Sequence, residues 1–268
     1  MSRSVARVSG RFLAILLTLT LATPLLSARC EAEQLDARAV LDDPRLYFTA
    51  PLRWDAQDWM YAAGTVLAIG VAHEYDDNVR AHFADGPHAT PGGTDPHSRR
   101  DFVPTAAVVG LTLAFATLLD DSAGYQETGS MVEAAAFTAV SNTVIKLAAG
   151  RMRPNDTTKV DDWSGGGNSF PSLHASVAFA VGTVLAESGG EDYRWVRRTL
   201  GYSIAAATTY VRVRDNVHWT SDVAGGAALG IATAHFVMNR RDRHSPSSAL
   251  TLESADGGVM LTYTRTLR

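Results

Sequence analysis

Three short polar clusters interrupt a largely apolar part of this sequence, between positions 146 and 222. They contain three cations, two histidines, one serine and one carboxylate: Lys146, Arg153, Ser172, His174, Arg212, His218 and Asp222. Cations and hydroxyl donors gathered in one place suit a tetrahedral oxyanion. A histidine close to a carboxylate suits covalent group transfer. The sequence therefore favours phosphoryl chemistry, and the surrounding elements must bring the three clusters together.

The first cluster supplies two cations. Lys146 and Arg153 are seven positions apart, which is two helical turns, so we expect them to share a helix face. Pro154 pushes Arg153 out of the α region, so Arg153 should lie where the helix ends. An arginine fork matches phosphate oxygens, and two cations attract a multiply charged anion. The alternative is that both cations only complement a helix C-terminus.

The second cluster precedes a predicted helix. Pro171 can occupy or precede the first helical turn. The backbone N–H groups of Ser172, Leu173 and His174 would then be unpaired and would form an anion site. Ser172 adds a hydroxyl donor, and His174 is placed to give a proton to a leaving oxygen. The alternative is a capping serine with an incidental histidine.

The third cluster has His218 and Asp222 at positions i and i+4. The carboxylate could hold one ring nitrogen and leave the other free. This is the arrangement of a catalytic triad in which histidine is the nucleophile. Arg212 supplies a third cation for the oxyanion. The alternative is a structural hydrogen bond near a helix start.

The order and spacing of these residues resemble the phosphatidic acid phosphatase type 2 superfamily. Its pattern is Lys, six residues, Arg-Pro; then Pro-Ser-Gly-His; then Ser-Arg, five residues, His, three residues, Asp. This sequence has Leu173 where the pattern has glycine and Val211 where it has serine. The resemblance extends from Lys146 to Asp222.

The resemblance implies a role for each matching residue. His218 would attack phosphorus and form a phosphohistidine, and Asp222 would orient it. His174 would protonate the leaving group and then activate water. The phosphoryl oxygens would be bound by Lys146, Arg153, Ser172, Leu173 through its N–H, and Arg212. The resemblance implies no metal and no other cofactor. Its implied substrates are phosphate monoesters or pyrophosphates, above all lipid phosphates.

Two other functions remain open at this point. Vanadate-dependent haloperoxidases resemble the same superfamily, and in such an enzyme His218 would hold vanadate. The departures at Leu173 and Val211 would also suit a non-catalytic envelope protein that binds lipid or phosphate.

The sequence pattern around the clusters predicts an all-α fold, a bundle of about six helices that must position them. The expected helices are 55–76, 102–119, 131–150, 172–188, 199–213 and 221–239. Small residues on their faces should let the helix axes approach closely. Most of the uncharged runs are shorter than a membrane span, which favours a soluble or surface-bound domain over a six-span enzyme. Only Phe102–Leu119 reaches the lower limit for a span.

The two ends of the chain differ from its middle. The expected division is 1–28 signal peptide, 29–54 N-terminal arm, 55–243 helical phosphatase domain and 244–268 C-terminal hairpin segment. Basic residues followed by the apolar run Phe12–Leu26 and a small-residue site predict export. The alternative is an uncleaved anchor. Both interpretations place the protein in the periplasm or cell envelope, with its active site outside the cytoplasm.

Alternating residues around a Gly-rich turn near the C-terminus predict a hairpin that packs on the bundle.

Composition narrows the possible partners. A net charge of −4 gives no indication of nucleic acid binding, and membrane association stays open. The single cysteine, Cys30, excludes an intrachain disulfide. His82, His88 and His97 lie in a polar stretch with no zinc-ligand spacing, so we expect a solvated loop.

Overall fold

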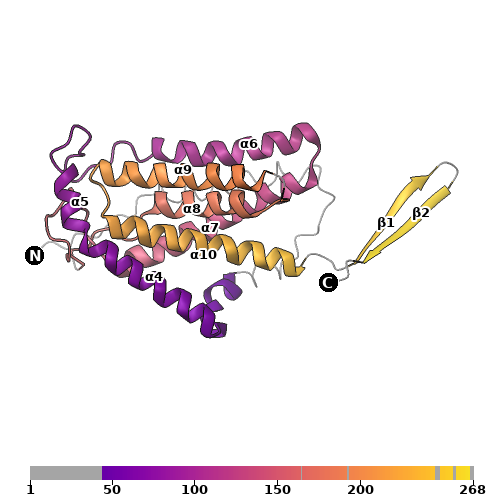
Figure 1. The fold of residues 1–268 in the computed structure, drawn as a ribbon, viewed down its shortest axis with the longest axis horizontal. Coiled ribbons are helices and arrows are strands. Elements are labelled where there is room, and N and C mark those ends of the chain that lie inside the picture. The colour runs from indigo at the N-terminus through magenta and orange to yellow at the C-terminus, as the bar shows by residue number, and fades with distance from the viewer. Residues whose placement is uncertain (1–43, 164, 192, 245–247, 256–257, 266–268) are drawn as a thin grey trace, which may run out of the picture.

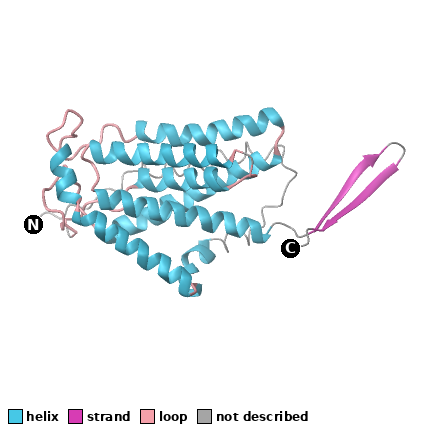
Figure 2. Cartoon of the chain, in the orientation of Figure 1, coloured by secondary structure: helices cyan, strands magenta, loops and turns pink. Residues whose placement is uncertain are grey.

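The computed structural model describes residues 44–163, 165–191, 193–244, 248–255 and 258–265. The predicted signal peptide and most of the predicted arm lie outside these residues. Between residues 44 and 244 the described chain is all-helical, as predicted (Figure 2). The predicted domain boundaries stay a prediction.

The helices follow one another with short connections, apart from two longer loops. They are η1 (Ala50–Arg53), α4 (Ala56–Glu74), α5 (Asp76–Phe83), η2 (Arg100–Phe102), α6 (Val103–Leu119), α7 (Ser122–Ala149), α8 (Leu173–Glu187), α9 (Arg194–Arg214) and α10 (Thr220–His244). The predicted helices correspond to α4 and α6 to α10, whereas α5 forms in a stretch that was predicted as loop. Helix α7 begins earlier than expected because the Asp121 side chain caps it by accepting from the Ala123 N–H.

Helix α8 runs through the middle of the bundle, between α7, α9 and α10 (Figure 1). The buried apolar core joins α7, α8 and α10 through Met131, Ala134, Ala180, Val181, Val184, Ala234 and Val237. A Cβ atom at Gly230 would lie 2.1 Å from the carbonyl oxygen of Ser176, so α10 meets α8 backbone to backbone. Gly182 and Gly201 make a similar contact between α8 and α9. The predicted close approach of small-residue faces is confirmed.

Helix α6 lies at the edge of the bundle and is the most apolar helix described (Figure 1). Within the described residues, Arg100–Leu119 is the one helical stretch long and apolar enough to cross a membrane, and 11% of its apolar window is buried. Five large apolar side chains of α6 are more than half exposed: Val103, Leu111, Phe115, Leu118 and Leu119. Helix α4 also exposes large apolar side chains, among them Trp59, Met60 and Leu67.

Two strands follow the helices. Strands β1 (Ser248–Ala255) and β2 (Gly258–Arg265) pair antiparallel, with Ser248 opposite Arg265. The pair lies apart from the helices in Figure 1, so the expected packing on the bundle is not found. The hairpin as a folded unit stays a prediction, and none of the predicted site residues lies in it.

Candidate active site

The three clusters meet at one end of the bundle, where α8 begins, α9 ends and α10 begins. His174 lies in the first turn of α8, Arg212 in the last turn of α9, and Asp222 in the first turn of α10. His218 lies in the connection that leads from α9 into α10, and its backbone N–H donates to the Arg212 carbonyl at 3.2 Å. Helix packing therefore brings together residues that are far apart in the sequence.

The imidazole of His218 faces the carboxylate of Asp222. Nδ1 lies 3.4 Å from Asp222 Oδ2 and 3.5 Å from Ser169 Oγ, which are long contacts. Because Nδ1 faces the carboxylate, Nε2 is the nitrogen on the other side of the ring. Burial lowers the pKa of His218 well below its usual value, and Arg153 and Lys146 add to the shift. The ring is therefore neutral, which is the nucleophilic form of imidazole.

The carboxylate of Asp222 is held from several directions. Ser169 Oγ donates to Oδ2 at 2.5 Å and the Trp219 N–H at 2.9 Å, while Arg151 donates to Oδ1 at 2.8 Å. Arg151 is fully buried and also donates to Asp76 at 2.8 Å. Burial raises the pKa of Asp222, and Arg151 and Ser169 oppose that rise. These donors fix the carboxylate beneath the imidazole.

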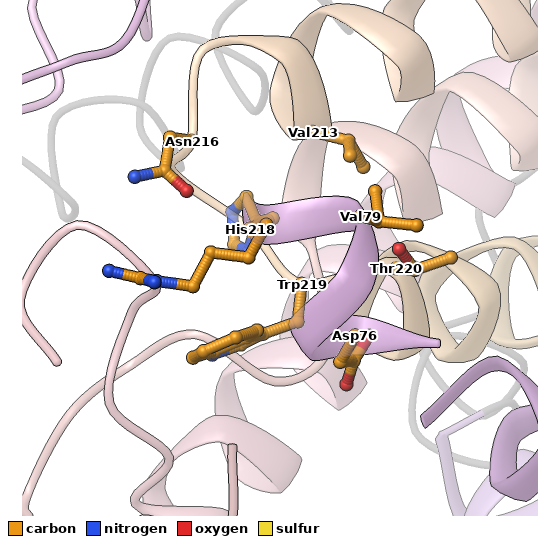
Figure 3. Close-up of a pocket in the computed structure, with 8 residues that line it drawn as sticks. Asp76, Val79, Val213, Asn216, His218, Trp219 and Thr220 are labelled. Atoms are coloured by element: carbon orange, nitrogen blue, oxygen red, sulfur yellow. The ribbon is translucent and has the colours of Figure 1, made fainter. Parts of the chain in front are cut away.

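Helix α5 contributes to this support through its first residue, Asp76. Asp76 accepts from the Ser221 N–H at 2.8 Å and from Ser221 Oγ at 2.5 Å. Figure 3 shows Asp76 next to the turn that carries His218, Trp219 and Thr220. A small hollow beside His218 is lined by residues of α5, the end of α9 and this turn. A helix that was predicted as loop therefore steadies the start of α10.

Lys146 and Arg153 meet on the same residue, although they do not share a helix face. Helix α7 ends at Ala149, because Gly150 takes a left-handed conformation with φ of 60°. The prediction of a shared face was therefore wrong. Lys146 Nζ donates to the Asn168 carbonyl at 2.5 Å, and Arg153 Nε donates to Asn168 Oδ1 at 3.0 Å. Burial, together with Arg153, lowers the pKa of Lys146 to about 7.

Arg212 and Ser172 each have a side-chain hydrogen-bond donor that finds no acceptor within the described residues. Both residues are fully buried. Arg212 donates to Asp101 at 2.5 Å and also to Asp95, but its Nε has no partner there, and neither has Ser172 Oγ. A buried donor without a partner is rare and requires an explanation. A phosphoryl group that accepted from both donors would supply the missing partner.

Ser172 occupies the N-cap position of α8 without a side-chain cap. Its backbone N–H donates to the Asp222 carbonyl at 3.0 Å, so the prediction that this N–H is unpaired was wrong. Leu173 and His174 lie in the first turn, where a helix offers their N–H groups no internal partner. Leu173 has ordinary helical backbone, since it is not among the described residues with positive φ. Leucine therefore fits where the motif has glycine.

His174 is a neutral ring in a tight contact. Its Nε2 lies 2.6 Å from the Ser98 carbonyl oxygen, and because a carbonyl only accepts, Nε2 carries the proton. The ring stacks on Phe102 with 4.0 Å between centroids. Burial, followed by the charge of Arg212, lowers the pKa of His174 to about 3.

Several residues of this site were not assigned a role from the sequence. They are Asp76, Asp95, Asp101, Arg151 and Ser169. Arg151 lies between Lys146 and Arg153 of the first cluster, and Ser169 lies just before Pro171 of the second. A cation and a hydroxyl with no assigned role at these positions were the sequence signal that could have identified them. The sequence around Asp76 and Asp95 contains no motif that indicates a functional role, because only long-range packing brings these residues to the site.

The described residues contain no group of three or more His, Cys, Asp or Glu side chains placed to hold a metal ion. His97 instead lies 3.6 Å from the Asp215 carboxylate.

Comparison with known proteins finds a family match for part of the helical region, from within α7 onward. Residues 127–245 match the PAP2 superfamily, and this range includes all three clusters. This stretch of the chain is similar to the PAP2 superfamily. The similarity agrees with the motif order that the sequence displays.

The individual proteins that are similar to this chain share limited sequence identity with it. The chain is 35% identical over 114 residues to a protein of Porphyromonas gingivalis named lipid A 1-phosphatase, which covers 42% of this chain. The chain spans about a fifth (21%) of the length of that relative. Among solved structures it is similar to Aquifex aeolicus LpxE, with 19% identity and a TM-score of 0.32, covering 55% of this chain and 88% of the other. It is also similar to a transmembrane PAP2 type phosphatidylglycerolphosphate phosphatase from Bacillus subtilis, with 17% identity and a TM-score of 0.36, covering 86% and 97%.

Proposed function

We propose that this protein is a phosphatase that hydrolyses phosphate monoesters or pyrophosphates, in particular lipid phosphates, through a phosphohistidine. The observation that carries the proposal is the pairing of a neutral, buried His218 with Asp222 beside three cations. An imidazole attacks phosphorus only when it is neutral, and the burial that lowers the pKa of His218 keeps it so. Buried cations aimed at the phosphoryl oxygens stabilise the charge that develops in the transition state.

In the first step, Nε2 of His218 forms a bond to phosphorus and the phosphorus–oxygen bond to the leaving group breaks. Asp222 Oδ2 faces Nδ1 and stabilises the positive charge that the ring acquires. The departing oxygen takes a proton from His174. The pKa of His174 is about 3 in this structure, so the negative charge of a bound phosphoryl group must raise it before the ring can serve as the acid.

In the second step, water attacks the phosphohistidine. His174 accepts a proton from the water as its oxygen bonds to phosphorus, and the phosphorus–nitrogen bond to His218 breaks. Inorganic phosphate leaves, and His218 returns to its neutral state. Through both steps, Lys146, Arg153 and Arg212 hold the phosphoryl oxygens together with Ser172 Oγ and the N–H of Leu173. The unpartnered donors of Arg212 and Ser172 support this assignment.

A lipid phosphate is the substrate class that the surface of the domain supports best. Helix α6 leaves Leu111, Phe115 and Leu118 exposed, each at 60% or more. Apolar surface of this extent is costly in water and marks a contact with lipid or protein. A relative named lipid A 1-phosphatase points in the same direction. We therefore place the enzyme at a lipid surface of the cell envelope, with α6 against the acyl chains.

Export to the periplasm and a folded C-terminal hairpin complete the proposal. A signal peptide spanning 1–28 predicts a mature chain that begins at or near residue 29. N-terminal sequencing of the protein recovered from cells would give that residue, and recovery of an intact Met1 would contradict export with cleavage.

Removal of residues 245–268 should leave turnover unchanged, since no predicted site residue lies there.

The test of the activity is phosphate release in the presence of EDTA. The panel is a chromogenic monoester, phosphatidate and a polyprenyl diphosphate. We expect release by the wild type and none above background by His218→Ala. The matched control is His235→Ala, which changes an exposed histidine farther along α10 and should keep full activity. Undiminished turnover in His218→Ala would exclude the phosphohistidine.

The other functions predict different outcomes in the same samples. A vanadate-dependent haloperoxidase would oxidise halide when vanadate and peroxide are supplied, without releasing phosphate. A non-catalytic envelope protein would bind the anion and turn over nothing.

A further inference from the structure

The loop that joins α5 to η2 reaches into the proposed phosphoryl site. Its residue Asp95 contacts two of the three cations there: Arg153 Nη1 at 3.0 Å from Asp95 Oδ2, and Arg212 Nη2 at the same oxygen. In η2, directly after the loop, Asp101 Oδ2 accepts from Arg212 Nη1 at 2.5 Å. Both arginines that should hold the phosphoryl group are therefore held by carboxylates of one segment.

The same segment also engages the proposed acid. The Ser98 carbonyl accepts the Nε2 proton of His174 at 2.6 Å, and Phe102, in η2 at the end of the loop, stacks on the ring. The segment therefore holds one ring nitrogen of the proposed acid. Between them, the loop and η2 therefore engage three groups of the proposed mechanism: Arg153, Arg212 and His174.

A carboxylate and a phosphoryl group compete directly for an arginine. Both are anionic and accept the same N–H donors of a guanidinium. The side chain of Arg212 is fully buried and that of Asp95 is 18% exposed, so few other donors or waters can intervene. Burial alone would raise the pKa of Asp95, but Arg212 and Arg153 lower it to about 2. The carboxylate is thus ionised at any working pH, and a competing anion rather than a proton must displace it.

Outside the site, the segment is held by polar contacts to two neighbouring stretches. Asn155 Nδ2 donates to the Pro91 and Thr94 carbonyls, both at 3.1 Å, and the Gly93 N–H donates to Asp156 at 2.5 Å. The Thr90 N–H donates to the Asp215 carbonyl at 2.9 Å, and His97 lies 3.6 Å from the Asp215 carboxylate. None of residues 90–101 belongs to the buried apolar core. Segments with polar attachments and little apolar burial open at low cost, so this one can leave without unfolding the bundle.

We propose that residues 90–101 form an autoinhibitory segment in which the Asp95 carboxylate takes the place of a phosphoryl oxygen, and that substrate binds by displacing it. The proposal rests on the proposed phosphatase site, because it assigns Arg153 and Arg212 to the phosphoryl group. A purely structural role, in which Asp95 holds the two arginines ready for substrate, predicts the opposite change in affinity when the charge is removed.

The first test is calorimetric titration of the full chain with inorganic phosphate, which needs no turnover. Asp95→Asn removes the competing charge and keeps the side-chain shape, so it should bind phosphate roughly tenfold more tightly than the wild type. The matched control is Asp85→Asn, an exposed aspartate just before the segment, which should bind as the wild type does. Thermal unfolding of each variant checks that the fold is kept. Equal or weaker binding by Asp95→Asn, or no binding by any of the proteins, would overturn the proposal.

The second test uses the unaltered protein. Hydrogen exchange of the wild-type chain should become faster in residues 90–101 when phosphate is added, because the bound anion releases the segment. Slower exchange there would mean that the segment closes over the anion, which would also overturn the proposal. Since neither test measures catalysis, an inactive His218→Ala with unchanged Asp95→Asn binding would leave the phosphatase assignment intact and reject only the inhibitory segment.

Discussion

At the residue scale, Lys146 is the one cation of the site whose charge changes within the ordinary working pH range. Burial and the neighbouring Arg153 lower its pKa to about 7, whereas arginines stay charged. A lysine with a lowered pKa is protonated below that value and neutral above it. Since only the protonated amine attracts a phosphoryl group, affinity should be highest below about pH 7 and fall as the pH rises through it.

We therefore predict that the KM for a phosphate monoester rises roughly tenfold between about pH 6 and pH 9, the range expected for losing one charge-assisted hydrogen bond. Lys146→Arg keeps the charge throughout and should flatten the rise. Initial-rate kinetics across the pH range provide the measurement, with Lys159→Arg, an exposed lysine, as the control. A profile of Lys146→Arg identical to that of the wild type would show that another group causes the pH dependence.

At the element scale, the position of His218 relative to His174 depends on how closely α10 approaches α8. His174 lies at the start of α8, and the turn into α10 carries His218. Gly230 sets the approach of these two helices, because a Cβ there would lie 2.1 Å from the Ser176 carbonyl oxygen. The obstacle is backbone, so it cannot move aside as a flexible side chain would.

Gly230→Ala should therefore push α10 away from α8, destabilise the fold by about 1–3 kcal/mol through overpacking and lower kcat/KM. Thermal unfolding and phosphate release on the same sample would measure both. Gly64→Ala in α4 is the matched control, since no atom lies within 4 Å of its added Cβ. There alanine should stabilise the helix by about 0.5–1 kcal/mol. If Gly230→Ala melted at or above the wild-type temperature, the two helices would be free to separate at no cost.

At the scale of the whole molecule, charge and apolar surface lie in different places. The candidate site residues gather at one end of the bundle, whereas exposed apolar side chains lie along outer helices, α4 and α6 among them. Only 11% of the apolar window in Arg100–Leu119 is buried. This division suits an enzyme that holds its site at the headgroups while α6 contacts the acyl chains.

Substitution of Leu111 or Leu118 by Glu should weaken binding to phosphatidylglycerol vesicles by roughly tenfold or more, given the free energy of burying one leucine. Co-sedimentation with vesicles measures this. Ala232→Glu introduces the same charge at an exposed position of α10 and should bind like the wild type. Equal loss in all three variants would indicate a general charge effect, and no loss in any of them would remove α6 from the lipid contact.

The all-α fold and the main helices could be predicted from the sequence because helical periodicity, caps and breakers act over a few residues. The spacing of Lys146, His174 and His218 also indicated the candidate site, since residue order alone carries that motif. Local signals placed the end of α7 correctly at Gly150, but the spacing argument still put Lys146 and Arg153 on one helix face, although Arg153 lies beyond that end. Local signals missed α5, a short helix with a polar sequence that packs through the buried Asp76.

The sequence by itself determined which side chains are available for chemistry, since residue type and order carry that information. The tertiary structure alone decided what those side chains contact. Arg151 and Asp76 support Asp222 because three distant segments pack against one another. An ion pair between such segments produces no periodic pattern in the sequence. Asp95 reaches Arg212 across 117 positions for the same reason. The state of the site, whether open or held by its own loop, is therefore a property of packing that no local pattern records.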